Sequence, residues 1–231
     1  MKILTIPDIH GKTLWKTVFN PSFDLILFLG DYVDCFTTPD SVIEENLLNI
    51  VSLKKQYPDK VKLLWGNHEM HYLFPVSYYR CSGYRSSMIQ SLNPILTHNK
   101  SLFQLAFQHE NYLWSHAGVH RGWWNYAFKG DSNQNIADQL NEAFNNHDPY
   151  VQNSKTDRLF DCGWDRGGTE KVGGPLWIDR NSMWEKGLSG IHQIVGHSKV
   201  DRIMTCKTKN EGSVSFCDCL DAIEDYKIIE I

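Results

Sequence analysis

Short apolar segments alternate with polar turns along the first third of the chain. Residues 2–6 (KILTI), 23–30 (FDLILFLG) and 60–66 (KVKLLWG) are the three strongest of these segments, and glycine or polar residues follow each one. Segments of this length are typical of β-strands. The second is almost continuously apolar, which favours a strand that is buried on both faces.

A helical pattern lies between the second and third of these segments. Within residues 41–57, apolar side chains recur at positions 42, 43, 47, 50, 51 and 53, as on one face of an amphipathic helix. Pro39, Asp40 and Ser41 suit its start, and Pro58 suits its end. Strands that alternate with helical segments in this way predict an α/β sheet with parallel neighbouring strands.

The rest of the chain carries weaker patterns. Residues 79–107 favour helices with breaks, and residues 129–175 are polar, with a short helix expected near 134–146. Further strands are expected at 110–119 and, in hairpin order, at 192–200, 202–208, 212–220 and 226–231. We therefore predict a single domain over residues 1–231 that contains both parallel and antiparallel strand pairs.

Composition and charge exclude several classes of protein. Hydrophobic residues make up 42% and charged residues 22% of the chain, and the net charge is −4, which argues against a general polyanion binder. No apolar run reaches the roughly 18 residues of a membrane span, and no signal-peptide pattern opens the chain. The six cysteines are scattered, without the paired spacing of a zinc site. A reduced, cytoplasmic protein is expected, without a membrane or a stable nucleic-acid partner.

Polar clusters follow five of the expected strands. They are PDIHG (7–11), GDYVD (30–34), GNHE (66–69), SHAG (115–118) and GHS (196–198). In α/β sheets, ligand sites form beyond the carboxyl ends of the strands, so we expect these clusters to meet. The side chains that they deliver are Asp8, His10, Asp31, Asp34, Asn67, His68, His116 and His197.

Carboxylate, imidazole and amide ligands suit manganese, iron or zinc, whereas a thiolate site is excluded. Several such ligands are enough for two metal ions about 3.5–4 Å apart. One aspartate must then bridge the ions, because close cations need shared negative charge. Asp31, from the middle of the set, is the candidate.

These motifs carry a resemblance to a known family. In order and spacing, the sequence resembles the calcineurin-like metallophosphoesterases, and within them the phosphoprotein phosphatase branch of bacterial and phage type. That pattern is GDxHG, GDxxDRG, GNHE, HGG or HAG, and a late GH, and its counterparts here run from residue 7 to 198. The tail at 216–231 is similar to the closing strands of that branch. The resemblance implies a layered α/β/β/α sandwich with mixed sheets.

The resemblance also implies a role for each matching residue. Asp8 and His10 would hold the first metal, Asp31 would bridge, and Asn67, His116 and His197 would hold the second. His68 would be the general acid, oriented by Asp34. The nucleophile would be a metal-bridging hydroxide that attacks phosphorus directly. Two divalent ions are implied, with manganese preferred and iron or zinc as alternatives.

The sequence departs from the family patterns in three motifs. Pro7 replaces a glycine, Cys35 and Phe36 replace an Arg-Gly pair, and Lys199 replaces the second histidine of the GHxH motif of nuclease branches. The lost arginine normally grips a phosphate oxygen, and a fork-shaped donor is still needed. The replacement candidates, in order of preference, are Arg180, Arg85, Arg80 and Arg166.

The expected function is metal-dependent hydrolysis of phosphate monoesters, including phosphoserine or phosphothreonine in proteins. Lys199 argues against the nuclease branches. One alternative is hydrolysis of dinucleoside polyphosphates or other nucleotides on the same fold. Another, of a different class, is a non-catalytic binding module, which the complete ligand set argues against. The other histidines are expected to be structural. His71 is the closest to an exception, because it would lie one helical turn beyond His68 if a helix starts there. Trp123 and Trp124 are expected to pack in the core or line a groove.

Overall fold

Two five-stranded sheets form the centre of the computed structural model, which describes residues 1–151, 154–209, 211–220 and 226–231. The first sheet contains, in spatial order, β10 (Lys227–Glu230), β1 (Lys2–Ile6), β2 (Leu25–Phe28), β3 (Val61–Leu64) and β4 (Phe103–Gln104). The second contains β5 (Ala106–His109), β6 (Tyr112–Ser115), β7 (His192–Val195), β9 (Ser213–Phe216) and β8 (Met204–Lys207).

Both sheets are mixed, with one antiparallel edge strand in the first and two in the second. Strands β1 to β4 are parallel neighbours, while β10 runs antiparallel to β1. In the second sheet β6, β7 and β9 are parallel, and β5 and β8 pair antiparallel at the edges. Consecutive parallel strands bring their carboxyl ends to one edge of a sheet, where a site can form.

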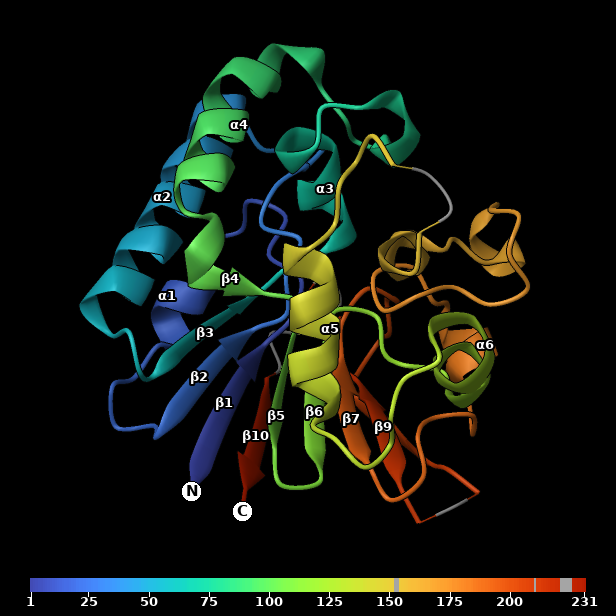
Figure 1. The fold of residues 1–231 in the computed structure, drawn as a ribbon. Helices are drawn as coiled ribbons and strands as arrows, with labels where there is room; N and C mark the ends of the chain where they lie inside the picture. Colours follow the sequence, from blue (N-terminus) through green and yellow to red (C-terminus); the bar gives the residue numbers. More distant parts are fainter. Residues whose placement is uncertain (152–153, 210, 221–225) are drawn as a thin grey trace.

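Helices cover the outer faces of the two sheets (Figure 1). On the side of the first sheet lie α1 (Trp15–Val18), α2 (Asp40–Gln56) and α4 (Ile89–His98), and on the side of the second lies α6 (Arg180–Met183). The remaining helices are α3 (Asn67–Leu73), which starts just beyond β3, α5 (Ile136–Asn145), a π-helix at Trp123–Phe128 and five 3-10 turns at 77–79, 86–88, 100–102, 156–160 and 164–166.

Side-chain alternation along the strands explains the layering. Ile3 packs with Trp114 of the second sheet, whereas its neighbour Leu4 belongs to the core under the helices. The two sheets are also joined by a hydrogen bond, since Trp114 Nε1 donates to Thr5 Oγ1 over 2.9 Å. Successive residues of a strand point to opposite faces, so each strand contributes to two apolar layers. The predicted layered sandwich with mixed sheets is confirmed.

The late strands correct part of the sequence prediction. Only β8 and β9 form a hairpin, since β7 and β9 are parallel and β10 leaves this sheet to pair with β1. The segment 79–107, expected to be helical, ends in β4 and the start of β5. Apolar patterns identify strands but not their partners, which explains the first error. Residues 221–225 of the tail lie outside the described part of the chain.

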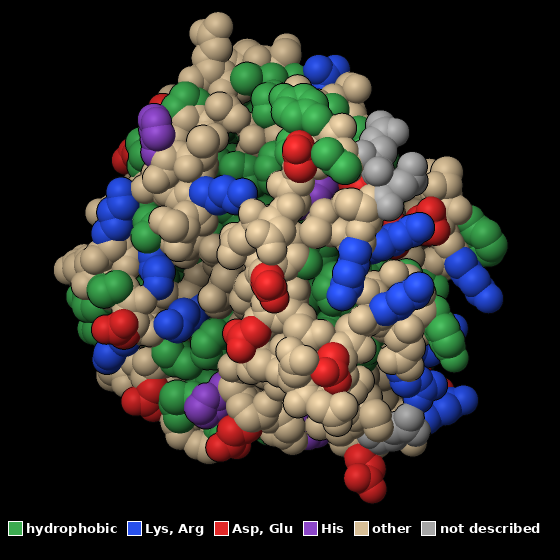
Figure 2. All heavy atoms as spheres, viewed as in Figure 1, with side chains coloured by type: hydrophobic (Ala, Val, Ile, Leu, Met, Phe, Trp, Pro, Cys, Tyr) green, Lys and Arg blue, Asp and Glu red, His purple; other side chains and the backbone are tan. Residues whose placement is uncertain are grey.

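Acidic and basic side chains are interspersed over much of the face in Figure 2, in keeping with the small net charge of −4. Within the described residues, no helix has both the length and the apolar character required to traverse a lipid bilayer.

Candidate metal centre

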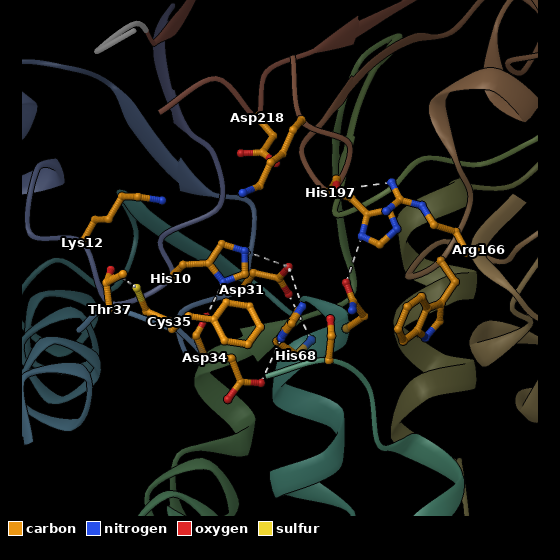
Figure 3. Close-up of a pocket in the computed structure, with 15 residues that line it drawn as sticks. His10, Lys12, Asp31, Asp34, Cys35, Thr37, His68, Arg166, His197 and Asp218 are labelled. Atoms are coloured by element: carbon orange, nitrogen blue, oxygen red, sulfur yellow. Dashed lines mark hydrogen bonds and ion pairs between the residues drawn. The ribbon is translucent and has the colours of Figure 1, made fainter. Parts of the chain in front are cut away.

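The polar clusters after the strands meet at one edge of the two sheets. Asp8 and His10 follow β1, Asp31 and Asp34 follow β2, Asn67 and His68 open α3, His116 follows β6 and His197 follows β7. Six of these eight residues line a hollow of about 610 Å³, shown in Figure 3. Asp8 and His116, which are not in its lining, are buried beside it.

Glycines permit this convergence. A Cβ atom on Gly66 would lie 2.2 Å from Asp31 Oδ1, and one on Gly196 would lie 2.0 Å from Asp8 Oδ1. Both distances are far below any contact that real side chains make. Glycine is therefore needed at these two positions, because the backbone there lies directly against a carboxylate.

The site residues also hold unusual backbone conformations. His10, Asp31, Asp34 and His197 have φ angles of 43°, 50°, 60° and 62°, in the left-handed region that non-glycine residues rarely adopt. Such conformations cost free energy and persist where the surrounding structure enforces them, often at functional sites.

Glu69 supplies much of that enforcement. Its buried carboxylate accepts hydrogen bonds from the backbone N–H groups of Asp31, Tyr32 and Val33, over 3.0, 2.7 and 3.3 Å, and from that of Gly66 over 2.9 Å. One side chain of α3 thus holds the loop after β2 against the loop after β3. Glu69 belongs to the GNHE motif but was not among the residues predicted to form the site.

Two clusters of donor atoms share Asp31. The carboxylate of Asp31 lies with ring nitrogens of His10 and His68 in one cluster, and with those of His116 and His197 in the other. Within each cluster the donor atoms lie within 4.8 Å of one another. A carboxylate that belongs to two such clusters occupies the position expected of a ligand that bridges two cations.

The second cluster fits a cation closely. Asn67 Oδ1 lies 2.8 Å from His116 Nε2 and 2.9 Å from His197 Nδ1, and the two nitrogens are 3.1 Å apart. His116 Nδ1 donates to the carbonyl of Leu29, so in a neutral ring the lone pair is on Nε2 and points at the others. Three electron-pair donors that converge in this way match the donor set of a first-row divalent ion.

The first cluster differs from the expected ligand set, because it includes His68 while Asp8 lies apart. His10 Nδ1 hydrogen-bonds to the carbonyls of Val33 and Asp34, at 3.0 Å each, and Nε2 lies 3.7 Å from Asp31 Oδ2. Both oxygens of Asp8 accept from the backbone N–H of His197 at 3.0 Å. Burial, Asp218 and Asp31 raise the pKa of Asp8, as expected for a carboxyl that a cation could neutralise.

The pKa shifts of the histidines differ between the candidate metal ligands and the candidate general acid. Burial lowers the pKa of His10, His116 and His197, so these rings stay neutral, as metal ligands must. Burial also acts on His68, but Asp31 and Asp34 outweigh it and raise the pKa of that imidazole. His68 therefore holds a proton, which favours the role of an acid over that of a ligand.

The proton of His68 is directed by Asp34. His68 Nδ1 lies 2.9 Å from Asp34 Oδ2, and the hydroxyl of Tyr72 donates to Oδ1 over 2.7 Å. Although burial opposes ionisation, His68 and His71 lower the pKa of Asp34 to about 2. The carboxylate is therefore ionised at neutral pH, and it engages Nδ1 of His68 while Nε2 of the same ring lies 4.0 Å from Asp31 Oδ2.

Of the four candidate arginines, only Arg166 lines this hollow. Its Nη2 donates to Ser198 Oγ over 2.7 Å, and its Nε lies 2.8 Å from Asp179 Oδ2. Arg85 instead pairs with Asp40 and the carbonyl of Cys35, and Arg80 lies over the ring of Tyr84. The lining of the hollow does not include Arg180, the preferred candidate.

Several residues of the hollow were not assigned to it from the sequence, namely Lys12, Thr37, Ser82, Trp177 and Asp218. Lys12 and Arg166 lie on opposite sides of the hollow in Figure 3, next to His10 and His197 respectively. The position of Lys12, directly after the first motif, was the one signal available for it. Trp123 and Trp124 are buried in the core.

Cys35, which stands where the family has arginine, also lines the hollow. Its thiol accepts a hydrogen bond from Thr38 Oγ1 over 3.1 Å. Burial raises the pKa of this thiol, but hydrogen bonds from Thr37 and Thr38 outweigh it and bring the pKa to about 7.

Comparison with known proteins agrees with this architecture. The family model described as calcineurin-like phosphoesterase matches residues 1–201. A cold-active protein-tyrosine phosphatase of a psychrophilic Shewanella has a similar structure, with 19% identity, a TM-score of 0.61, and coverage of 99% of this chain and 75% of that one. A second structure of a cold-active protein tyrosine phosphatase gives 19% identity and a TM-score of 0.66, with coverage of 99% and 73%. At these identities the likeness concerns the fold.

We expect Glu69→Gln to lower the free energy of unfolding by about 1–3 kcal/mol, because an amide NH₂ would face buried N–H donors that then lack an acceptor. Chemical denaturation measures this change. Glu45→Gln, on the exposed side of α2, is the control and should have no measurable effect. An unchanged Glu69→Gln protein would contradict the role of Glu69 as the clamp between the two loops.

Proposed function

Because this chain belongs to the calcineurin-like phosphoesterases, a family of metal-dependent hydrolases, we propose that it hydrolyses phosphate monoesters, including phosphoserine and phosphothreonine in proteins. The observation that carries the proposal is the sharing of Asp31 by two clusters of donor atoms at the edge of an open hollow. A bridged pair of cations is an arrangement that many phosphatases use.

The residues present fit two divalent cations. His10, Asp31 and Asp8 would hold the first, and Asp31, Asn67, His116 and His197 the second, with manganese preferred and iron or zinc as alternatives. Bound there, the two ions would supply a Lewis acid for the phosphate oxygens and a water of lowered pKa. The neutral state of the three imidazoles supports this assignment.

His68 is proposed as the general acid. Its Nδ1 is engaged by Asp34, so Nε2 is the atom from which a proton can reach the leaving oxygen. The side chain lines the hollow and its pKa is raised, so the proton is present in the resting enzyme near neutral pH. Asp34 keeps the ring in the orientation needed and stabilises its charged form.

Arg166 is proposed as the group that binds the phosphate, in place of the arginine that Cys35 replaced. It is the candidate that lines the hollow, and its guanidinium is held in place by Ser198 and Asp179. Nη2 also donates to the carbonyl of His197 over 3.5 Å, so the two N–H groups of Nη1 are the ones proposed to bind phosphate oxygens. Lys12 would contribute a second positive charge from the opposite side.

The lining of the hollow favours one alternative substrate class. Lys12, Arg166 and Lys199 all line it together with Asp218, and three cationic side chains around one hollow are compatible with a substrate that carries several phosphates. Dinucleoside polyphosphates or other nucleotides are therefore the second candidate substrates. The non-catalytic binding module, a rival of another class, would need no acid beside the ligands, and His68 and Asp34 argue against it.

A comparison of substrates tests the proposal. Purified protein stripped with a chelator and reloaded with manganese is assayed on a phosphoserine peptide, a phosphotyrosine peptide and a diadenosine polyphosphate. We expect loss of activity on chelation, recovery on reloading, and the highest kcat/KM with a phosphopeptide. Highest activity on the diadenosine compound would favour the alternative, and no activity on any substrate would favour the binding module. His68→Ala and Asp31→Ala should each abolish hydrolysis of the phosphopeptides without unfolding the protein.

Arg166→Ala should lower kcat/KM for phosphomonoesters by about 10²-fold, since a charge-assisted bidentate contact with phosphate is worth roughly 1.5–3 kcal/mol. Arg180→Ala, which removes the arginine preferred from the sequence, is the matched control and should lower it less than about twofold. Steady-state kinetics on one peptide measures both. The reverse order of effects would return the phosphate-binding role to Arg180.

Asp34→Asn should shift the alkaline limb of the kcat/KM profile to lower pH. In the wild-type protein the carboxylates of Asp31 and Asp34 raise the pKa of His68, so the acid form persists above the ordinary value of 6.5. Without the charge of Asp34 the pKa of His68 falls, and the proton needed for catalysis is lost at lower pH. A profile with an unchanged alkaline limb would show that another group controls it.

A further inference from the structure

A second histidine of α3 faces the same carboxylate as His68. His68, His71 and Tyr72 are spaced at i, i+3 and i+4 on this helix, so they lie on one face. That face meets Asp34, which approaches from the loop after β2. The spacing explains how one short helix brings three polar side chains to one carboxylate.

The contacts with Asp34 are close and divide between its oxygens. His71 Nε2 lies 2.8 Å from Oδ2, the oxygen that His68 Nδ1 contacts at 2.9 Å. The hydroxyl of Tyr72 donates a hydrogen bond to the other oxygen, Oδ1. His71 Nε2 has no aligned hydrogen-bond partner among the described residues, so its contact with Oδ2 acts through charge.

The ring of His71 is held firmly from its other side. Its side chain is fully buried, its Nδ1 lies 3.4 Å from Cys81 Sγ, and the ring of Tyr84 packs edge-on against it. Cys81 Sγ also accepts a hydrogen bond from Asn67 Nδ2 over 3.8 Å, which turns Oδ1 of that amide towards His116 and His197. A chain of contacts thus joins Asn67 to Asp34 through Cys81 and His71.

We propose that His71 is a positioning residue for the general acid, which holds Oδ2 of Asp34 in the place where it orients His68. The inference rests on the proposed function, because it assigns a role within that site. His71 does not line the hollow, so it acts through Asp34 and not on the substrate.

The need for such a residue follows from the position of Asp34. Asp34 has a strained φ of 60° and lies in a loop, and a carboxylate that rotated by a few tens of degrees would no longer hold His68. The rings of His68 and His71 on Oδ2 and the hydroxyl of Tyr72 on Oδ1 together fix the orientation of the Asp34 carboxylate. Asp34 and Cys81 outweigh the effect of burial and raise the pKa of His71 to about 9, so the ring carries its charge at neutral pH.

Leaving-group dependence distinguishes this role from a structural one. A phosphoserine peptide expels a strongly basic alkoxide that needs the proton of His68, whereas 4-nitrophenyl phosphate expels a stable phenolate that needs it far less. We expect His71→Phe, a ring of similar size without charge, to lower kcat about tenfold on the peptide and less than threefold on 4-nitrophenyl phosphate, with KM little changed. His71→Gln, which restores an N–H dipole, should recover part of the loss on the peptide.

His98→Phe, the same substitution at an exposed position of α4, should leave both substrates unaffected, and His68→Ala sets the full size of the leaving-group effect. Thermal unfolding shows whether each variant is folded. Should His71→Phe fail to fold, His71→Gln is expected to show the same split at smaller size. Equal losses on both substrates, or none, would overturn the inference, whereas a wild-type protein inactive on both would overturn the proposed function instead.

Discussion

The arrangement of the site depends on the position of one carboxylate, that of Asp31. This carboxylate belongs to both clusters of donor atoms and accepts a hydrogen bond from the backbone N–H of His68 over 3.0 Å. The backbone carbonyl of Asp31 also accepts a hydrogen bond, from the backbone N–H of His10 over 2.6 Å. The loops after β1, β2 and β3 therefore meet at this residue. Glu69 secures the arrangement from beneath, through four backbone N–H groups that would otherwise be buried without an acceptor.

The same burial has opposite effects on different histidines. At His116 and His197, desolvation outweighs the charge of the nearby Asp31, so the pKa is lowered and a lone pair stays available. His68 has a second carboxylate beside it, that of Asp34, and there the charged form is favoured. One hollow can thus contain imidazoles suited to bind cations and an imidazole suited to donate a proton, because the distribution of carboxylates is uneven.

Loss of the arginine after Asp34 changes the distribution of charge around the hollow. Cys35 and Phe36 leave the loop after β2 without a cation, while Arg166 approaches from the segment before α6 and Lys12 from the loop after β1. We propose that phosphate binding is thereby divided between two elements that lie on opposite sides of the hollow. His71, behind Asp34, then adds a charge that does not touch the substrate.

The sequence by itself determined β1, β2, β3, the helix α2 and the polar residues that follow these strands, because apolar periodicity and glycine-flanked polar motifs are local signals. It did not determine β4 or the start of β5, which lie in a segment predicted to be helical. The sequence did not determine which strands pair. The parallel pairing of β7 with β9 and the position of β10 beside β1 followed only from the packing of the two sheets. Which arginine borders the hollow was also decided in three dimensions: Arg85 is engaged by Asp40, and Arg166 is anchored by Ser198 and Asp179. Contacts between side chains that are distant in the sequence decided these outcomes. Such contacts also decided the charge of the histidines, since nearby carboxylates favour the charged forms of His68 and His71 whereas His116 stays neutral.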